Sequence, residues 1–171
     1  MPFTPIHMGP GLLLKSVLQR HFSLMVFGWS QIVMDLQPLA VIVTGEGHMH
    51  GFTHTYLGAF VIAIIAALSG KFLAELGLRM LDRTQHLPIR WRVAVISAFI
   101  GAYSHVLLDS LMHTDIEPFA PWSLNNPLLG WMTIDHLHLF CVGAGLLGLG
   151  LYPLIHHWRM RHSHASGHQA R

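Results

Sequence analysis

Four long stretches of mostly apolar residues dominate the chain. Each approaches the ~20 apolar residues that an α-helix needs to cross the hydrocarbon core of a bilayer. A shorter stretch, Gly9 to Leu18, has leucines on one side and Lys15 on the other, and is expected to form a short helix at the membrane interface or partway into it. The pattern predicts an all-α integral membrane bundle of about four transmembrane helices plus this short N-terminal helix. The four spans are expected over Phe22 to Val43, Tyr56 to Leu73, Val93 to Leu111 and Leu137 to Ile155.

Composition agrees with a membrane protein. Hydrophobic residues make up 52% of the 171 positions and charged residues 11%, against roughly 25% charged in an ordinary soluble domain. The net charge of +2 reflects scattered arginines and no basic stripe, so DNA or RNA is not an expected partner. Membrane lipids are the expected partners of such a chain. With Cys141 as its single cysteine, the chain can form no internal disulfide. We expect one membrane-embedded domain over residues 1–158 and a flexible tail rich in histidine and arginine over residues 159–171.

The arginines predict an orientation. Four of them lie in the connection from Arg79 to Arg92, whereas the connections from Thr44 to Thr55 and from Met112 to Asp135 contain no lysine or arginine. The positive-inside rule therefore places the Arg79 to Arg92 connection and both termini in the cytoplasm. The alternative is that the Gly9 to Leu18 helix dips into or crosses the membrane, which would reverse the location of the N-terminus.

Ionisable side chains inside the third apolar stretch point to chemistry. His105, Asp109 and His113 are spaced by four, and each step of four advances only ~40° around a helix. The three side chains share one face if the helix continues through His113. Imidazole and carboxylate groups at this spacing can chelate one metal ion. Inserting two ionisable side chains into the membrane on one buried helix face costs free energy and has little structural use unless they bind something. For His105 and Asp109 we therefore favour a metal site.

Two further features fit the same site. His50 and His54 are again four apart, directly before the strongest apolar run, and Asp35 interrupts the first span. Asp35 could be a metal ligand, a general base, a proton-relay group or a helix-pairing residue. A lone histidine in an apolar helix is more often a packing residue, and His113 and Asp115 are each expected to be solvated near the membrane surface.

Four short motifs combine these polar residues. They read Thr4-Pro5-Ile6-His7, Met34-Asp35-Leu36-Gln37-Pro38, His50-Gly51-Phe52-Thr53-His54-Thr55 and Ser104-His105-Val106-Leu107-Leu108-Asp109, the last leading into a proline-rich return. Together they resemble the inner-membrane metal-dependent hydrolases often called YdjM-like. One departure is that Gln37 stands where relatives carry a second carboxylate. The resemblance implies a bacterial inner-membrane, multi-pass protein whose metal-site residues are His7, Asp35, His54, His105 and Asp109, with His50 beside them.

The function expected from this resemblance is metal-dependent hydrolysis. A divalent ion, most fittingly Zn²⁺, would activate water with Asp35 or Asp109 as the catalytic carboxylate, on a lipid or phosphoester substrate. The sequence contains no Gly-x-Ser-x-Gly elbow, Walker loop or dinucleotide fingerprint that would support another chemistry. The alternative is a non-catalytic membrane protein, such as a metal or proton transporter or a stress-related structural component. Polar residues distributed through the membrane would favour transport, and a single pocket holding all ligands would favour hydrolysis.

Overall fold

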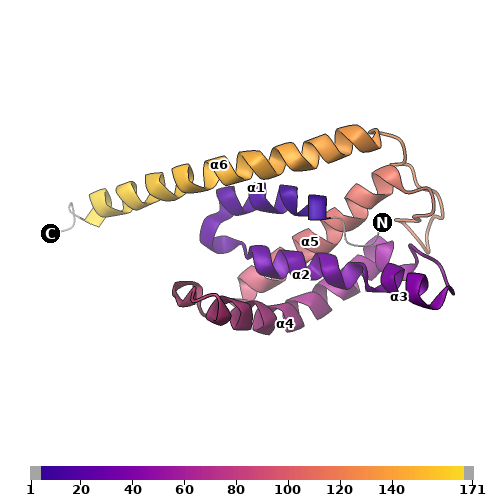
Figure 1. Cartoon of the computed structure of the whole chain (residues 1–171), viewed down its shortest axis with the longest axis horizontal. Helices are drawn as coiled ribbons and strands as arrows, with labels where there is room; N and C mark the ends of the chain where they lie inside the picture. The colour runs from indigo at the N-terminus through magenta and orange to yellow at the C-terminus, as the bar shows by residue number, and fades with distance from the viewer. Residues whose placement is uncertain (1–4, 168–171) are drawn as a thin grey trace.

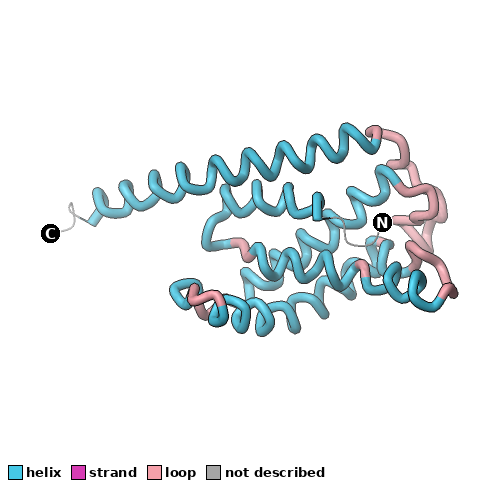
Figure 2. Tube along the Cα trace, viewed as in Figure 1, coloured by secondary structure: helices cyan, strands magenta, loops and turns pink. Residues whose placement is uncertain are grey.

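The computed structural model describes residues 5–167, and helices joined by loops make up this part of the chain (Figures 1 and 2). Four helices are long and apolar enough to cross a membrane, over Leu24–Thr44, Tyr56–Met80, Trp91–Met112 and Ile134–Arg161. The predicted all-α bundle of four spans and a short N-terminal helix is therefore confirmed. The elements are η1 Pro5–His7, α1 Met8–Leu18, η2 Gln19–His21, α2 Leu24–Met34, α3 Leu36–Thr44, η3 Phe52–His54, α4 Tyr56–Met80, η4 Thr84–His86, α5 Trp91–Met112 and α6 Ile134–Gly167.

The first span is broken at Asp35, between α2 and α3. Pro38 explains the position of the break. Proline lacks an N–H group, and its ring clashes with the carbonyl four residues earlier, which here belongs to Met34. The chain still turns in the helical direction, because the Leu39 N–H donates to the Asp35 carbonyl at 3.0 Å. The break leaves Asp35 inside the bundle at the junction of two helices.

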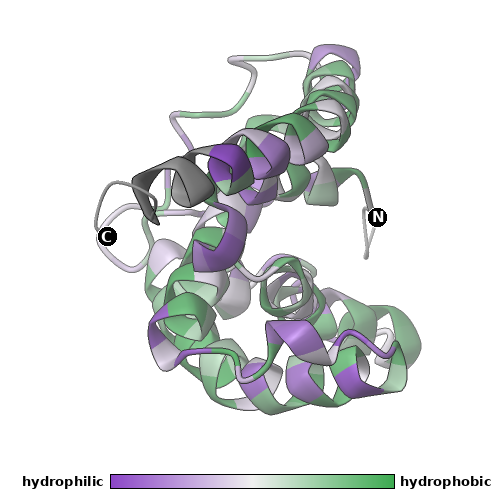
Figure 3. Cartoon of the chain, turned by 90° about the vertical axis from the view of Figure 1, so that its left-hand side faces the viewer, coloured by the Kyte–Doolittle hydropathy of each residue, from purple (hydrophilic) through white to green (hydrophobic). Residues whose placement is uncertain are grey.

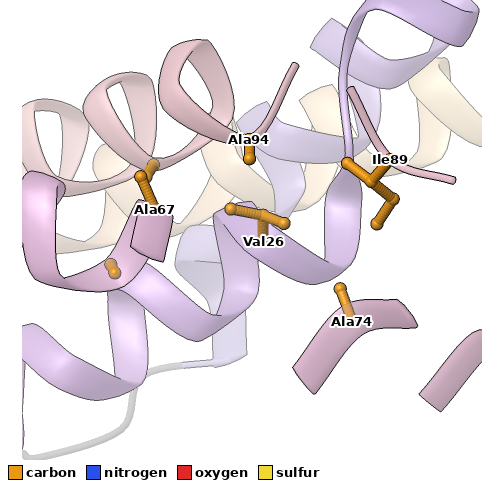
Figure 4. Packing of buried hydrophobic residues seen from close by; sticks show 7 residues of the cluster. Val26, Ala67, Ala74, Ile89 and Ala94 are labelled. Carbon is orange, nitrogen blue, oxygen red and sulfur yellow. The ribbon is translucent and has the colours of Figure 1, made fainter. Parts of the chain in front are cut away.

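Helices α2, α4 and α5 form a tightly packed three-helix group. Small side chains fill their interface, with Val26 of α2 lying among Ala67 and Ala74 of α4 and Ala94 of α5 (Figure 4). Small residues allow helix backbones to approach closely where lipid provides no hydrophobic drive to association. Large apolar side chains such as Phe60, Leu68 and Phe72 are instead exposed on the outside. Much of the helical ribbon is accordingly coloured green, for hydrophobic residues, in Figure 3. This distribution suits a bundle surrounded by hydrocarbon.

Helix α1 packs along α6 and runs in the same direction. Gly9 lies against the backbone of Cys141, and Gly148 lies against the backbone of Leu12, so residue numbers rise together along both helices. The 11 residues of α1 extend about 16 Å, roughly half the thickness of the hydrocarbon core. The short helix therefore enters the bundle partway from the end where α6 begins.

This packing corrects one prediction. The expectation that both ends of the chain lie on one side is wrong for the described start of the chain, because His7 lies at the level where α6 begins and α6 ends at the opposite side (Figure 1). The packing of α1 along α6 agrees with the alternative of a short helix that dips into the membrane. Hydropathy alone left the position of this helix open, because α1 is too short to count as a span. The predicted domain boundary at residue 158 falls within α6, the flexibility of the tail stays a prediction, and its last residues, 168–171, lie outside the described part.

Candidate metal centre

Five predicted site residues converge in the interior. His7 ends η1, Asp35 lies at the α2–α3 break, His54 ends η3, and His105 and Asp109 lie one turn apart on α5. Their side chains come from four separate parts of the chain, and each residue is at most 5% exposed. Acidic and basic side chains are almost never buried to this extent unless they are paired or bind something.

Local structure holds His54 in place. The Thr55 hydroxyl accepts from the Gly58 N–H at 2.8 Å and caps the start of α4, while the Tyr56 N–H donates to the Pro118 carbonyl at 2.8 Å. Gly58 lies directly against the Phe52 backbone, where a side chain has no room. The turn before α4 is thus folded over the helix end, and His54 points into the bundle.

Four of the residues form a compact group. The His105 Nε2 atom lies 3.3 Å from both Asp35 Oδ1 and Asp109 Oδ2, and His54 Nε2 lies 3.6 Å from Asp109 Oδ2 and 3.9 Å from Asp35 Oδ1. One ligand atom from each residue lies within 4.8 Å of all the others. Ligand atoms held ~2.1 Å from a tetrahedral Zn²⁺ are ~3.4 Å apart, so the group is close to the size that an ion requires.

His7 adjoins this group. Its Nε2 atom lies 3.5 Å from Asp109 Oδ1, and its ring meets the His105 ring edge-on at 5.3 Å between centroids. Burial lowers the pKa of His7 to about 4, and burial also lowers the pKa of His54. Both imidazoles are therefore neutral at pH 7, the form in which histidine binds a metal ion.

Hydrogen bonds on the far side of the rings determine which nitrogen faces the centre. The Gln31 amide donates to the Gly101 carbonyl at 2.9 Å, which leaves its oxygen to accept from His105 Nδ1 at 2.7 Å. An amide oxygen can only accept, so Nδ1 of His105 carries the proton. The Nε2 lone pair of His105 is thereby directed at Asp35 and Asp109. Histidines that bind metals typically have such a partner on the other ring nitrogen.

A parallel chain of hydrogen bonds orients His54. The Thr53 hydroxyl donates to the Gln37 Oε1 atom at 2.9 Å and lies 3.0 Å from His54 Nδ1. Because its hydrogen is used, the hydroxyl accepts from His54 Nδ1, and the Nε2 lone pair faces the centre. Gln37, which the sequence marked only as a missing carboxylate, therefore acts through Thr53 on the orientation of His54.

Several buried atoms of the site residues have no hydrogen-bond partner. They are both ring nitrogens of His7, the Nε2 atoms of His54 and His105, and the Oδ1 atom of Asp109. More than nine in ten buried polar groups in proteins are hydrogen-bonded, so a cluster of unpartnered lone pairs is unusual. Nitrogen and carboxylate lone pairs converging on one point fit a divalent cation.

His50 lies in a second, adjoining group. Ligand atoms of His50, Asp109 and His113 lie within 4.8 Å of one another, and the rings of His50 and His113 are 4.4 Å apart. His50 Nδ1 also lies 2.8 Å from Asp115 Oδ2. Asp115 is exposed as expected, with 53% of its side chain accessible, but it also pairs with His50. His113 is only half-buried, and the return after α5 brings its ring against that of His50. Sequence spacing missed this pairing, since 65 residues separate His50 from Asp115.

An apolar cleft of about 590 Å³ leads to the centre. Gln31, Asp35 and His105 line one end, and Leu24 and Met25, about 16 Å away along α2, line the other. Met25, Ile32 and Leu73 on its walls are 36–44% exposed on the outer surface of the bundle. The cleft therefore opens sideways, toward the region that lipid chains occupy around a membrane span. The remaining lining residues are Met8, Gly28, Trp29 and Ala74.

The fold and the site define a multi-pass membrane protein with a buried histidine and aspartate group that can hold a metal ion. The sequence model of the YdjM inner membrane protein family matches residues 13–167, and the chain belongs to that family. The resemblance carried by the sequence motifs is confirmed. The match begins after His7, so the place of His7 beside Asp109 rests on the structure. No curated protein and no solved structure matched the chain.

Proposed function

We propose that this protein is a metal-dependent hydrolase of the bacterial inner membrane that cleaves an ester or phosphoester bond of a lipid. One observation carries the proposal. The buried histidine and aspartate group, which has unpartnered ligand atoms, contributes Asp35 and His105 to one end of an apolar cleft whose walls reach the outer surface of the bundle. A membrane lipid has the matching form, with an apolar chain for the cleft and a polar ester group for the centre.

Zn²⁺ is the ion that we propose. Two imidazoles and two carboxylates are ligands that Zn²⁺ accepts in a four-coordinate site. His54, His105 and Asp109 would hold it, with His7 completing the set when Asp35 serves as the base. When bound, such an ion polarises the scissile bond and lowers the pKa of water to about 7.

Asp35 is the proposed general base. It is the one carboxylate that lines the cleft, so it lies where substrate and water arrive. In the hydrolysis, the water oxygen bonds to the carbonyl carbon or phosphorus and its proton passes to the Asp35 carboxylate. The bond from that carbon or phosphorus to the alcohol oxygen then breaks, and protonated Asp35 returns the proton to the leaving alcohol oxygen. His105 lines the same end of the cleft, and its bond to Gln31 keeps the ring fixed during this step.

The distribution of buried charge favours this function over transport. Among the described residues, the buried acidic and basic side chains all belong to the centre except Lys71. Lys71 pairs with Glu75, which in turn accepts from the Ile89 N–H at 3.0 Å, so that pair fastens a loop to α4. A transport path requires ionisable groups at several depths.

Metal content is the first test. The protein, truncated after Met160 to remove tail histidines, is purified in detergent and its zinc is counted by plasma mass spectrometry. We expect about one ion per chain, lost in Asp109→Asn and kept in His138→Ala, a histidine of α6 that belongs to neither group. Absence of zinc and of other divalent ions from the wild type would refute the proposal.

Activity is tested on the loaded protein. Release of fatty acid or phosphate from phospholipids in mixed micelles is measured for the wild type and Asp35→Asn. We expect turnover by the wild type, stopped by a chelator, and a loss of at least about 100-fold in the variant, since general-base catalysis contributes 10²–10⁴-fold. Equal rates in the two proteins would remove Asp35 from the mechanism.

A further inference from the structure

A second pocket, of about 410 Å³, lies at the opposite end of the bundle from the His50 loop. The turn that joins α1 to α2 forms one wall, and the loop before α5 forms the other. Its polar lining consists of Lys15, Arg20, His21, Ser23, Gln85, His86 and Arg90, and Tyr152 of α6 closes one side.

The charge of this pocket is one-sided. Three side chains on its walls, Lys15, Arg20 and Arg90, are cationic at neutral pH, and no aspartate or glutamate is among the described residues that line it. The Lys15 ammonium is fixed in place, because it donates to the carbonyls of Gln19 and Phe22, each at 2.8 Å. An ammonium has three hydrogens, so one remains for a ligand. An anion is the ligand that such walls favour.

The same pocket also has an apolar side. Phe22, Leu24, Met25, Leu78, Ile89 and Val93 belong to its lining, and Leu24 and Met25 also line the cleft that leads to the centre. Cationic groups beside an apolar lining that is shared with an apolar cleft suit an amphiphile better than a free anion. The arginine-rich connection puts this end of the bundle at the cytoplasmic surface, where anionic lipid headgroups lie.

We propose that this pocket binds the headgroup phosphate of an anionic phospholipid of the cytoplasmic leaflet, with the start of an acyl chain on Leu24 and Met25. The phosphate lies between Lys15, Arg20 and Arg90. The site is separate from the candidate metal centre, and its occupation requires no hydrolysis. Binding and turnover therefore succeed or fail independently.

Native mass spectrometry of the full chain in detergent tests the proposal. Phosphatidylglycerol and phosphatidylcholine with identical acyl chains are titrated in turn, and inorganic phosphate and glycerol 3-phosphate are added as competitors. We expect wild-type protein to bind phosphatidylglycerol at least about tenfold more tightly than phosphatidylcholine, with no competition by either soluble phosphate at millimolar concentration. Equal binding of the two lipids would overturn the proposal, and effective competition would show a free-anion site instead.

Paired arginine variants locate the binding. Arg20→Gln with Arg90→Gln should weaken phosphatidylglycerol binding by about 30-fold, since each direct ion pair with the phosphate contributes about 1 kcal/mol, or about fivefold. Arg83→Gln with Arg92→Gln is the control, because it removes the same charge from the same end of the bundle outside the pocket. The control should bind within about twofold of the wild type. A similar loss in both double variants would attribute the effect to general surface charge and overturn the assigned pocket.

Discussion

Replacing Gln31 by leucine tests whether the centre depends on the orientation of its histidines. Gln31 is 8% exposed and does not lie among the candidate ligands, but its amide joins the Gly101 carbonyl to His105 Nδ1. Leucine has a similar volume and keeps the apolar contacts. The substitution therefore removes two hydrogen bonds and leaves the Nδ1 proton of His105 buried without an acceptor.

Two losses are expected in the Gln31→Leu variant, one in stability and one in metal affinity. Leaving a buried donor unsatisfied costs about 1–3 kcal/mol, so the free energy of unfolding of the metal-free protein should fall by about that amount. Loss of the group that orients a histidine ligand typically lowers metal affinity 10–100-fold, or about 1.4–2.7 kcal/mol. The His105 imidazole is then free to rotate or to change tautomer, and its Nε2 lone pair faces Asp35 and Asp109 for only part of the time.

The assay is a Zn²⁺ titration in detergent against a chromophoric chelator, with thermal unfolding of the metal-free protein measured in parallel. Gln19→Leu is a matched control, because Gln19 is also buried and donates to a carbonyl of α6, but does not contact the centre. We expect both variants to lose stability and only Gln31→Leu to lose affinity. Wild-type affinity in Gln31→Leu would refute the reasoning that this hydrogen bond orients a ligand.

Three further results are expected. A chelator should lower the unfolding temperature of the wild type, since an ion at 100 times its Kd stabilises the folded protein by about 2.7 kcal/mol. The unfolding temperature of Asp109→Asn should not change. Equal shifts of the unfolding temperature in the two proteins would place the ion elsewhere. Gly148→Val should lower the free energy of unfolding by about 1–3 kcal/mol, because the added Cβ would lie 2.5 Å from the α1 backbone. Gly143 has open space around it, so Gly143→Val should leave the thermal unfolding of the protein unchanged. Ile32→Trp places a larger side chain on the wall of the cleft and should slow hydrolysis of long-chain lipids about tenfold, a loss equal to that of burying roughly two methylenes. Hydrolysis of a short soluble ester should be unaffected. Ile64→Trp is the control, because Ile64 is equally exposed but lies outside the cleft, and it should alter neither rate.

Much of the centre was open to prediction from local spacing. His105 and Asp109 are one helical turn apart, so the helix alone brings their side chains to one face. The same argument overreached at His113, because α5 ends at Met112 and His113 is in extended backbone. That residue meets His50 through the course of the loop, which helical periodicity does not describe.

The orienting glutamines lay beyond such reasoning. Gln31 is one polar residue in an apolar stretch, and Gln37 stood out only because relatives carry a carboxylate there; a polar residue in a span has several structural uses. Their roles depend on contacts with Gly101 and Thr53, which are 70 and 16 residues away in the chain. Only the packing of α2 against α5, and of the α2–α3 break against the turn before α4, brings these groups together.

The sequence by itself determined the class of the molecule, its four spans and the identity of the polar residues that must be accommodated inside them. Length and hydropathy suffice for this, because a bilayer requires every spanning segment to satisfy its own backbone hydrogen bonds as a helix. The tertiary structure decided where α1 lies, which lone pairs meet, and where the cleft and the cationic pocket open. Those features depend on contacts between side chains from segments that are distant in the sequence. The packing of helices through small residues determines these contacts, and the local spacing of residues along the chain does not predict them.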